Sequence, residues 1–159
     1  GVVSSPWMAI LMWALMGFGM AGIGFSIMHD ANHGSYSKNK RVNRVLGSMI
    51  HFIGGYDKNW KIQHNVLHHS FTNVEGYDED IELGIIRLSP NQKRKKIHYL
   101  QMFYAPVLYS LMMLNWSTVK DFVQLFKYNK KNLLKGQGLT LRKGLFQVIT
   151  VKLVYYSLM

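Results

Sequence analysis

The chain has 159 residues, 48% of them hydrophobic, and its 19 Lys and Arg against 8 Asp and Glu give a formal net charge of +11. A length of this order is typical of one domain, and the basic balance is compatible with nucleic acid or an anionic membrane surface as neighbour. The absence of cysteine excludes a disulfide framework and any thiolate metal site, so a metal would have to be bound by His, Asp or Glu.

A long uncharged segment opens the chain and runs from Pro6 to Met28. A helix of this length can cross a hydrocarbon core of about 30 Å, so we predict a transmembrane helix over about residues 6–28. A signal peptide is the competing interpretation, but it would have a shorter apolar core behind a basic segment. Because such a span has no place in a soluble nucleic-acid binder, we expect the basic residues to meet a membrane surface and no nucleic acid.

Small residues at Gly17, Ala21 and Gly24 share one face of this predicted helix. Such a face lets a second helix approach closely, and helix packing is favoured over the alternative, a groove that admits an acyl chain. No internal repeat or strand-like alternation follows, so we expect the remaining elements to be helices as well.

Two histidines follow the predicted span at once, in the sequence His29-Asp30-Ala31-Asn32-His33. If the helix continues by one turn, His29 and His33 lie one above the other on the same face. Two imidazoles at this spacing can share a metal ion. The alternative is a pair of polar residues at a helix end with no metal, which is common in the interfacial zone.

A second histidine cluster, His64-Asn65-Val66-Leu67-His68-His69, lies in the polar segment that extends to His98. His64 and His68 repeat the one-turn spacing, whereas His69 should be rotated by about 100° on an α-helix. Five histidines exceed the three or four protein ligands of a single zinc site, and their two directions suit a pair of metal ions. Imidazole binds Zn, Fe, Cu and Ni, so the residue type alone leaves the metal open.

Three further segments follow in chain order: an apolar helix over about 99–116, a basic connector over 117–144, and the start of a further apolar helix over 145–159. Pro106 and several tyrosines make the first of these a marginal membrane span. A full crossing would also put the basic connector on the outer side, against the positive-inside bias. A re-entrant or interfacial helix, or a tilted helix packed in the bundle, is therefore favoured there.

The motifs HDANHG and QHNVLHHSFTNVEGYDEDIE resemble the first and second histidine boxes of membrane fatty acid desaturases, closest to the acyl-lipid and acyl-CoA branch of front-end or linoleoyl-type enzymes. The resemblance extends more loosely from Gly17 to about Trp116. It implies a single partial desaturase domain over 1–159 with an all-α fold, an integral-membrane, multi-pass helical bundle. Cytoplasmic helices of this bundle, in the region 29–98, would carry a His-rich di-metal site.

The resemblance also implies that the five clustered histidines are ligands of two iron ions. The first box supplies two of them and the second box supplies three: His29 and His33, then His64, His68 and His69. The family's third box, near its C-terminal end, has no counterpart, because no histidine follows His98. We therefore expect the chain to be a fragment that is inactive alone, with the missing ligands supplied beyond Met159.

The activity implied by the resemblance is desaturation, in which O2, two electrons and the iron pair insert a double bond into a fatty acyl chain in lipid metabolism. Because a methylene offers neither an acidic proton nor a leaving group, a metal-based oxidant has to act on it. The implied partners are the lipid bilayer, an acyl-CoA or acyl-lipid substrate, and a separate electron donor such as a b-type haem cytochrome or ferredoxin. Two alternatives stay open: a related di-iron membrane hydroxylase acting on lipid or alkane, and a non-catalytic metal-binding membrane protein.

Polar residues near the clusters have weaker predictions. Asp30 and Asn32 could orient the imidazoles through hydrogen bonds, or Asp30 could only cap the helix end. His51 and His98 lie outside both clusters and are not expected to bind metal. We interpret the acidic residues of the second motif as a solvated face or a partner for nearby lysines rather than as ligands: Glu75, Asp78, Glu79, Asp80 and Glu82.

Two groups of residues are assigned to the membrane surface. Tyr56 and Trp60 precede the second cluster and are expected to anchor a helix at the headgroup level rather than to line an acyl passage. The basic run from Lys93 to Lys96 is expected to face headgroups rather than to bind the phosphates of coenzyme A or an acidic electron donor.

Overall fold

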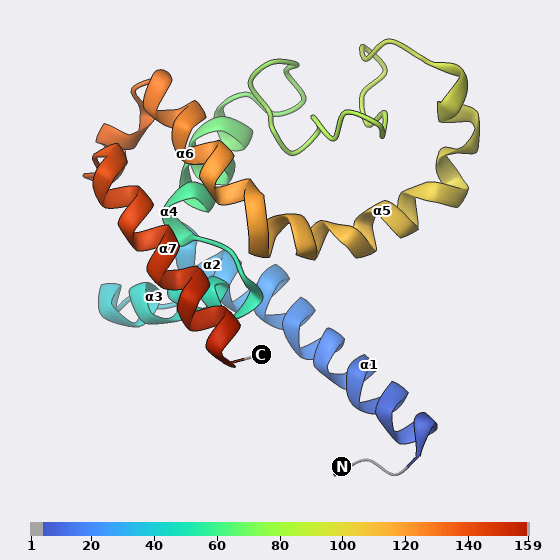
Figure 1. The fold of residues 1–159 in the computed structure, drawn as a ribbon. Coiled ribbons are helices and arrows are strands. Elements are labelled where there is room, and N and C mark those ends of the chain that lie inside the picture. Colours follow the sequence, from blue (N-terminus) through green and yellow to red (C-terminus); the bar gives the residue numbers. More distant parts are fainter. Residues whose placement is uncertain (1–4, 159) are drawn as a thin grey trace. The chain divides into compact units, whose positions relative to one another are not determined.

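The computed structural model describes residues 5–158, and all regular structure in that range is helical (Figure 1). The contacts divide the chain into two compact units, Gly1–Ile53 and Gly54–Met159, which are described in turn. The prediction of an all-α fold is confirmed for the described part of the chain.

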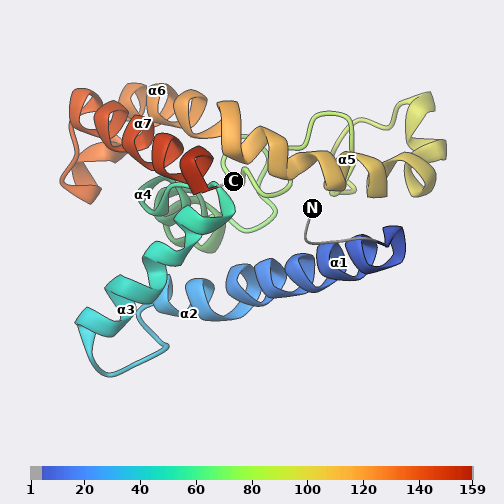
Figure 2. The same cartoon turned by 60° about the horizontal axis from the view of Figure 1, so that its bottom comes forward.

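The first unit begins with one long helix that reaches further than the predicted span. Three consecutive segments run on without a break (Figures 1 and 2): α1 (Pro6–Gly22), the π-type turn η1 (Ile23–Ile27) and α2 (Met28–His33). Pro6 occupies the first turn, where its missing N–H costs no helical hydrogen bond. Gly34 ends the helix in the left-handed conformation, at φ 76°. The helix therefore continues by the turn that carries His29 and His33.

This continuous helix, Pro6–His33, is the one segment among residues 5–158 that is long and apolar enough to cross a membrane. No residue of α1 is buried against the protein, so its apolar side chains require another apolar environment. On the face of small residues, a β-carbon at Gly24 would lie 3.7 Å from Ile53, whereas nothing lies within 4 Å of Gly17. The expected close packing is thus present at Gly24 and not at Gly17.

A loop and two short helices complete the first unit: α3 (Lys40–Gly47) and the 3-10 helix η2 (Ser48–Ile53). Asn39 caps α3 by accepting a hydrogen bond from the Arg41 amide at 2.9 Å. Buried Asn32 donates to the carbonyl of Gly47 at 3.1 Å and so ties α2 to α3. Position 47 has no room for a side chain, because a β-carbon there would lie 2.3 Å from the Asn32 side-chain oxygen. These contacts hold the end of the long helix in place within its unit.

The second unit consists of helices that precede and follow an irregular segment, residues 71–95. Two elements come before it: α4 (Asp57–Trp60) and the π-helix η3 (Lys61–His68). The others follow it: η4 (Lys96–Leu100), α5 (Gln101–Asn115), η5 (Trp116–Lys120), α6 (Asp121–Lys130), η6 (Leu133–Gln137) and α7 (Leu141–Leu158). The segment predicted as a basic connector, 117–144, is therefore largely helical and includes all of α6.

α5 coincides with the apolar helix predicted over about 99–116. None of its residues is buried, and it lies outside the one segment of the described chain that could cross a membrane. A full crossing by α5 therefore gains no support from the structure.

Helices α6 and α7 lie side by side (Figures 1 and 2) and share a hydrophobic core with η3 and η6. The close approach of α6 and α7 is possible because a β-carbon at Gly144 would already lie 2.8 Å from a Leu125 methyl group. The core is formed by buried residues of η3, α6, η6 and α7, together with one residue directly before α4 and one between η6 and α7: Ile62, Leu67, Leu125, Tyr128, Leu134, Val148, Tyr56 and Leu139.

One buried charge fastens α7 to its neighbours. Lys152 is 6% exposed and donates to Asp121 Oδ2 and to the carbonyl oxygens of Gly54 and Trp116, each at 2.5 Å. Asn59, which lies in α4, donates a hydrogen bond of 2.8 Å to the backbone carbonyl of Asp121. Because a buried charge is tolerated only when it is paired and hydrogen-bonded, this network fixes α4, which leads directly into the second histidine cluster.

Candidate metal centre

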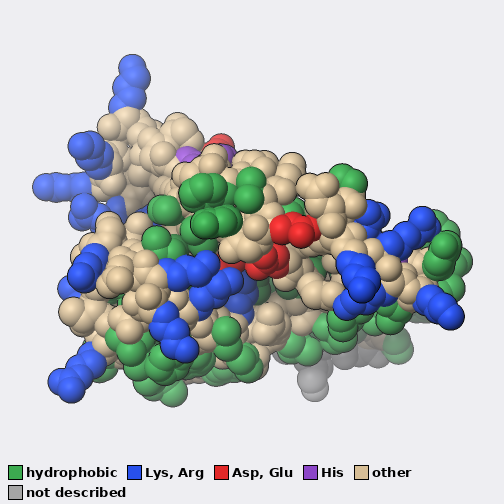
Figure 3. Space-filling view, turned by 90° about the horizontal axis from the view of Figure 1, so that it is seen from above, with side chains coloured by type: hydrophobic (Ala, Val, Ile, Leu, Met, Phe, Trp, Pro, Cys, Tyr) green, Lys and Arg blue, Asp and Glu red, His purple; other side chains and the backbone are tan. Residues whose placement is uncertain are grey.

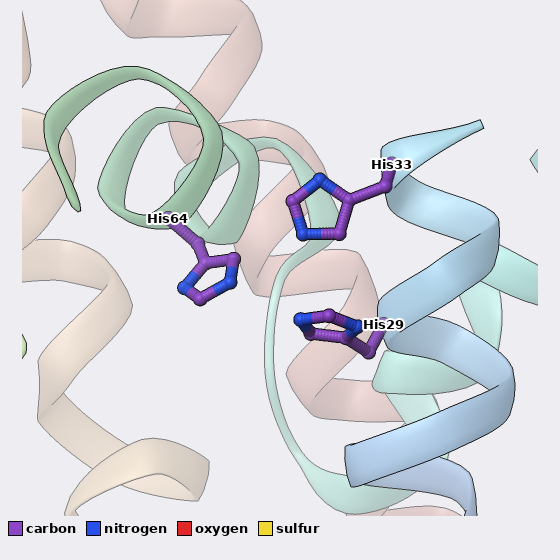
Figure 4. Close-up of side chains that lie close together, drawn as sticks. All are labelled: His29, His33 and His64. Atoms are coloured by element: carbon purple, nitrogen blue, oxygen red, sulfur yellow. The ribbon is translucent and has the colours of Figure 1, made fainter. Parts of the chain in front are cut away.

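His29 and His33 project from the same side of the long helix (Figure 4), as their one-turn spacing predicts. Their ring centroids lie 4.5 Å apart, with an interplanar angle of 70°. Asp30 Oδ1 lies 2.9 Å from His29 Nδ1, so Nε2 is the atom through which this ring would bind a metal. The orienting role predicted for Asp30 thus has a hydrogen bond that supports it.

Asn32 is placed differently. It is buried, its amide nitrogen donates to the carbonyl of Gly47, and the same nitrogen lies 3.3 Å from the sulfur of Met28. These contacts make Asn32 part of the packing between α2 and α3. Its predicted effect on the imidazoles stays a prediction.

The second cluster lies on the π-helix η3 and the residue after it, and not on an α-helix. Hydrogen bonds that reach five residues back widen the helical turn. The rings of His64 and His68 stack with centroids 5.0 Å apart and an interplanar angle of 13°. His69 lies edge-on to His64 at 4.8 Å, although a regular α-helix would have turned it about 100° away. The widened turn brings all three rings together, which the predicted α-helical geometry did not.

Two carboxylates hold the Nδ1 atoms of the second cluster. Asp78 Oδ1 and Oδ2 lie 3.0 and 3.1 Å from His68 Nδ1, and Asp80 Oδ2 lies 3.2 Å from His64 Nδ1. A metal-bound histidine commonly donates its other ring N–H to a carboxylate, which fixes the ring orientation and raises its basicity as a ligand. Nε2 is therefore the atom through which both rings would bind a metal.

The predicted alternatives for the acidic residues are a solvated face and pairing with nearby lysines, and the pairing is confirmed for Glu79, which lies 2.8 Å from Lys127 Nζ. The solvated face is wrong for three of the five. Asp78 is fully buried, and Glu79 and Asp80 are partly buried against other side chains. Asp78 also accepts hydrogen bonds from the amides of Asn73, at 2.8 Å, and Asp80, at 3.0 Å, which folds this segment back on η3. The other two acidic residues are exposed, as predicted: Glu75 and Glu82.

Three side chains of the second unit could share one metal ion. His64, His68 and Asp80 each offer a ligand atom, and these atoms lie within 4.8 Å of one another. Two imidazole nitrogens and one carboxylate oxygen form a donor set that suits non-haem iron, and it is also compatible with zinc. The residues present therefore fit an iron ion, with Asp80 able either to orient His64 or to bind the metal itself.

The charge of Asp80 suits both roles. Burial acts to raise the pKa of Asp80, but hydrogen bonds from His64 and Gln63 and the charges of His64 and His68 outweigh it, so the pKa is lowered from its ordinary value. The carboxylate is therefore ionised at neutral pH. Gln63, which donates to Asp80 Oδ1, had no role in the sequence prediction although it directly precedes the cluster.

The aromatic residues before the second cluster do not share one role. Tyr56 is 3% exposed, belongs to the core and donates its hydroxyl to Gln147, so its predicted place at the headgroup level is wrong. Trp60 stacks on His64, with ring centroids 4.6 Å apart. Trp60 therefore supports the cluster from the preceding turn.

The two remaining histidines lie outside both clusters in the sequence. His98 Nδ1 accepts a hydrogen bond from the backbone amide of Lys95 at 3.0 Å. His51 lies in η2 of the first unit. Neither histidine belongs to a group of metal-capable side chains within residues 5–158.

A cavity of about 480 Å³ opens beside the second cluster, within the same unit. Asp80, which holds His64, and Gln63, which donates to Asp80, form part of its polar wall. Lys120 lies over the Trp116 ring at 4.4 Å, and burial lowers the pKa of Lys120 to about 8 against the opposing effect of nearby carboxylates. No sequence motif marked the cavity residues of η5 and α6.

On the face shown in Figure 3, Lys and Arg side chains are widespread, whereas the visible acidic side chains lie mainly near the centre.

Comparison with known proteins gives one consistent result. Residues 5–158 match the family described as fatty acid desaturase. The chain is 38% identical over 122 residues to the sn-1 linoleoyl-lipid 6-desaturase of Arthrospira platensis, covering 76% of this chain and 33% of that protein. It is 39% identical over 127 residues to the acyl-lipid (8-3)-desaturase of Physcomitrium patens, covering 77% of this chain and 26% of that protein. The chain thus spans about a quarter to a third of the length of these relatives, and no solved structure matches it.

Proposed function

Because this chain belongs to the fatty acid desaturase family, we propose that it carries part of the metal site of a membrane enzyme that inserts a double bond into a fatty acyl chain. The predicted resemblance of the chain to that family is confirmed. Bound iron would supply the oxidising power towards an unactivated C–H bond, with O2 as oxidant and a separate electron donor such as a b-type haem cytochrome or ferredoxin.

The observation that carries this proposal is the pairing of clustered histidines with carboxylates. His29, His64 and His68 each have a carboxylate oxygen within 3.2 Å of Nδ1. A histidine that only fills space at a helix end needs no such partner, whereas a metal ligand does. We propose the five clustered histidines as ligands of two iron ions: His29, His33, His64, His68 and His69.

The residues around the second cluster have distinct tasks in this proposal. Asp78 fixes the ring of His68, and Asp80 fixes the ring of His64 while keeping its own negative charge. Trp60 covers one face of the His64 ring and limits its rotation. Both carboxylate contacts leave Nε2 of each ring as the atom that would bind a metal.

The proposed substrate is an acyl chain carried by a membrane lipid. The two relatives described above are a linoleoyl-lipid and an acyl-lipid desaturase.

The helix Pro6–His33 has 28 residues, so it is about 42 Å long, roughly 12 Å more than a hydrocarbon core. Its last turn, with His29 and His33, would stand outside the hydrocarbon. Basic residues that follow it, Lys38 and Lys40, favour the cytoplasmic side for this end.

The test is to express the complete protein in a host that lacks polyunsaturated acyl chains, to supply lipid-bound and coenzyme A-bound substrates, and to identify products by mass spectrometry. A desaturase yields a product lighter by two hydrogens, and a hydroxylase yields one heavier by an oxygen. His68→Ala should abolish the product, whereas His98→Ala should retain it because that ring only bonds a nearby backbone amide. Equal losses in both variants, or an oxygenated product alone, would contradict the proposal.

A further inference from the structure

Three consecutive acidic residues of the second unit face in alternate directions. Asp78 and Asp80 contact the histidines of the second cluster, whereas Glu79 contacts α6. Glu79 Oε1 lies 2.8 Å from a lysine Nζ, and Oε2 accepts hydrogen bonds from a tyrosine hydroxyl at 2.8 Å and a glutamine amide at 3.2 Å. These three donors share one face of α6, at helical spacing: Gln124, Lys127 and Tyr128.

A second set of hydrogen bonds connects the same face of α6 to His64. Gln124 also donates to Gln63 Oε1 at 2.6 Å, and Gln63 donates to Asp80 Oδ1. Asp80 and Glu79 are neighbours in the chain. The contacts among Gln63, Asp80, Glu79 and Gln124 therefore form a closed hydrogen-bonded circuit. Because Asp80 holds His64 Nδ1, this hydrogen-bonded circuit links the position of the His64 imidazole to α6.

The contacts of Glu79 are buried enough to be strong. The side chain of Glu79 is 11% exposed, Gln124 is 5% exposed as a residue, and Tyr128 is fully buried. Burial, together with the charge of Glu79 beside it, raises the pKa of Tyr128, so the hydroxyl keeps its proton and remains a donor. Hydrogen bonds to an ionised carboxylate are stronger than those between neutral groups, and the ammonium of Lys127 balances the charge.

We propose that Glu79 is a positioning residue for the second histidine cluster: by binding Gln124, Lys127 and Tyr128 of α6, it fixes the segment whose carboxylates orient His64 and His68. The inference rests on the proposed function in so far as these histidines bind metal. It gives a role to α6, which contains no histidine and lies far along the chain from both clusters.

The test measures Co²⁺ binding by the complete protein in nanodiscs, through competition with a chelator and through the visible absorption of the bound ion. Glu79→Ala should weaken Co²⁺ binding by about 10-fold or more and change the absorption, as expected when the partner of a ligating histidine is displaced. Glu79→Gln, which can still accept from Tyr128, should recover part of the loss. Two variants that remove one exposed charge nearby should match the wild type: Glu75→Ala and Lys130→Met.

Unchanged affinity and absorption in Glu79→Ala would overturn the inference. If this variant does not fold, Tyr128→Phe decides, because it removes one hydroxyl donor and should weaken Co²⁺ binding several-fold. Hydrogen exchange of the Asn73 and Asp80 amides, which donate to Asp78, provides a readout without metal. Glu79→Ala should speed their exchange, and unchanged exchange would refute the positioning role. A wild-type protein that binds no metal would refute the proposed function instead.

Discussion

Removing the Asp78 carboxylate tests how far the second cluster depends on its acidic neighbour. In Asp78→Ala, the amides of Asn73 and Asp80 lose their acceptor, and His68 Nδ1 keeps only the Asp80 carboxylate, at 3.5 Å. Asn73 is exposed, so its amide can bond to water instead. In Asp78→Asn the shape is kept and one acceptor oxygen remains, but the negative charge beside His68 is lost. The two variants therefore separate the charge from the packing.

The magnitudes follow from these contacts. A buried donor left without an acceptor costs about 1–3 kcal/mol, so the amide of Asp80 should lower the free energy of unfolding of Asp78→Ala by about 1–3 kcal/mol. Asp78→Asn should lower it by only about 1 kcal/mol. Both should weaken metal binding about 10- to 100-fold, which corresponds to about 1.4–2.7 kcal/mol.

The assay is a chelator competition with Fe²⁺ or Co²⁺ alongside urea unfolding of the metal-free protein. Glu75→Gln removes a charge from an exposed position of the same segment and serves as the control. Two results together would refute the assignment of Asp78 as the residue that orients His68: a metal affinity of Asp78→Asn equal to that of the wild type, and a free energy of unfolding of Asp78→Ala equal to that of the wild type.

Three further predictions concern stability. Gly47→Ala should lower the free energy of unfolding by about 1–3 kcal/mol, and with it the melting temperature, because its β-carbon would clash with the Asn32 side chain on α2. Gly17→Ala is the control and should leave the melting temperature unchanged, because nothing lies within 4 Å of that position. Equal effects of the two substitutions would contradict the packing of α2 against α3. Lys152→Met leaves the Asp121 carboxylate buried and should cost about 3–5 kcal/mol in urea unfolding; a neutral result would argue against the pair. Because burial lowers the pKa of Lys120 to about 8 from 10.5, the unfolded chain binds more protons than the native state between these values. Stability should therefore rise with pH across this window in the wild type relative to Lys120→Met, and parallel pH profiles of unfolding would contradict it.

The first histidine cluster could be predicted because it depends on local geometry alone. His29 and His33 follow an uncharged helical segment, and one additional turn is enough to place both rings on one face. The partner of His29 is the next residue, Asp30. Nothing distant along the chain is required.

The second cluster could be predicted only in part, because its geometry depends on contacts between distant residues. The α-helical spacing of His64 and His68 holds closely enough to bring them together, but the π-helix that adds His69 has no signal in the sequence. The carboxylates that hold the rings come from a turn with no helical spacing, in which side chains at alternate positions share one direction. That turn is folded by the buried Asp78, whose burial a charged sequence does not suggest.

The same reason explains the segment predicted as a basic connector. Its lysines suggested exposure, yet Leu125 and Tyr128 are both fully buried and lie at a helical spacing of three residues. Apolar residues at this spacing are the signal of an amphipathic helix, and here they were obscured by the surrounding positive charge. Lys152 shows the converse case, since a charge within an apolar segment is stabilised by a partner 31 residues away.

Iron analysis of the purified complete protein tests the central claim most directly. We expect two iron ions per chain in the wild type and a clear loss of iron in His64→Ala and His68→Ala, with His98→Ala unchanged. One zinc ion per chain with no iron after expression in iron-supplemented medium, or iron content that does not respond to the two histidine substitutions, would contradict the account.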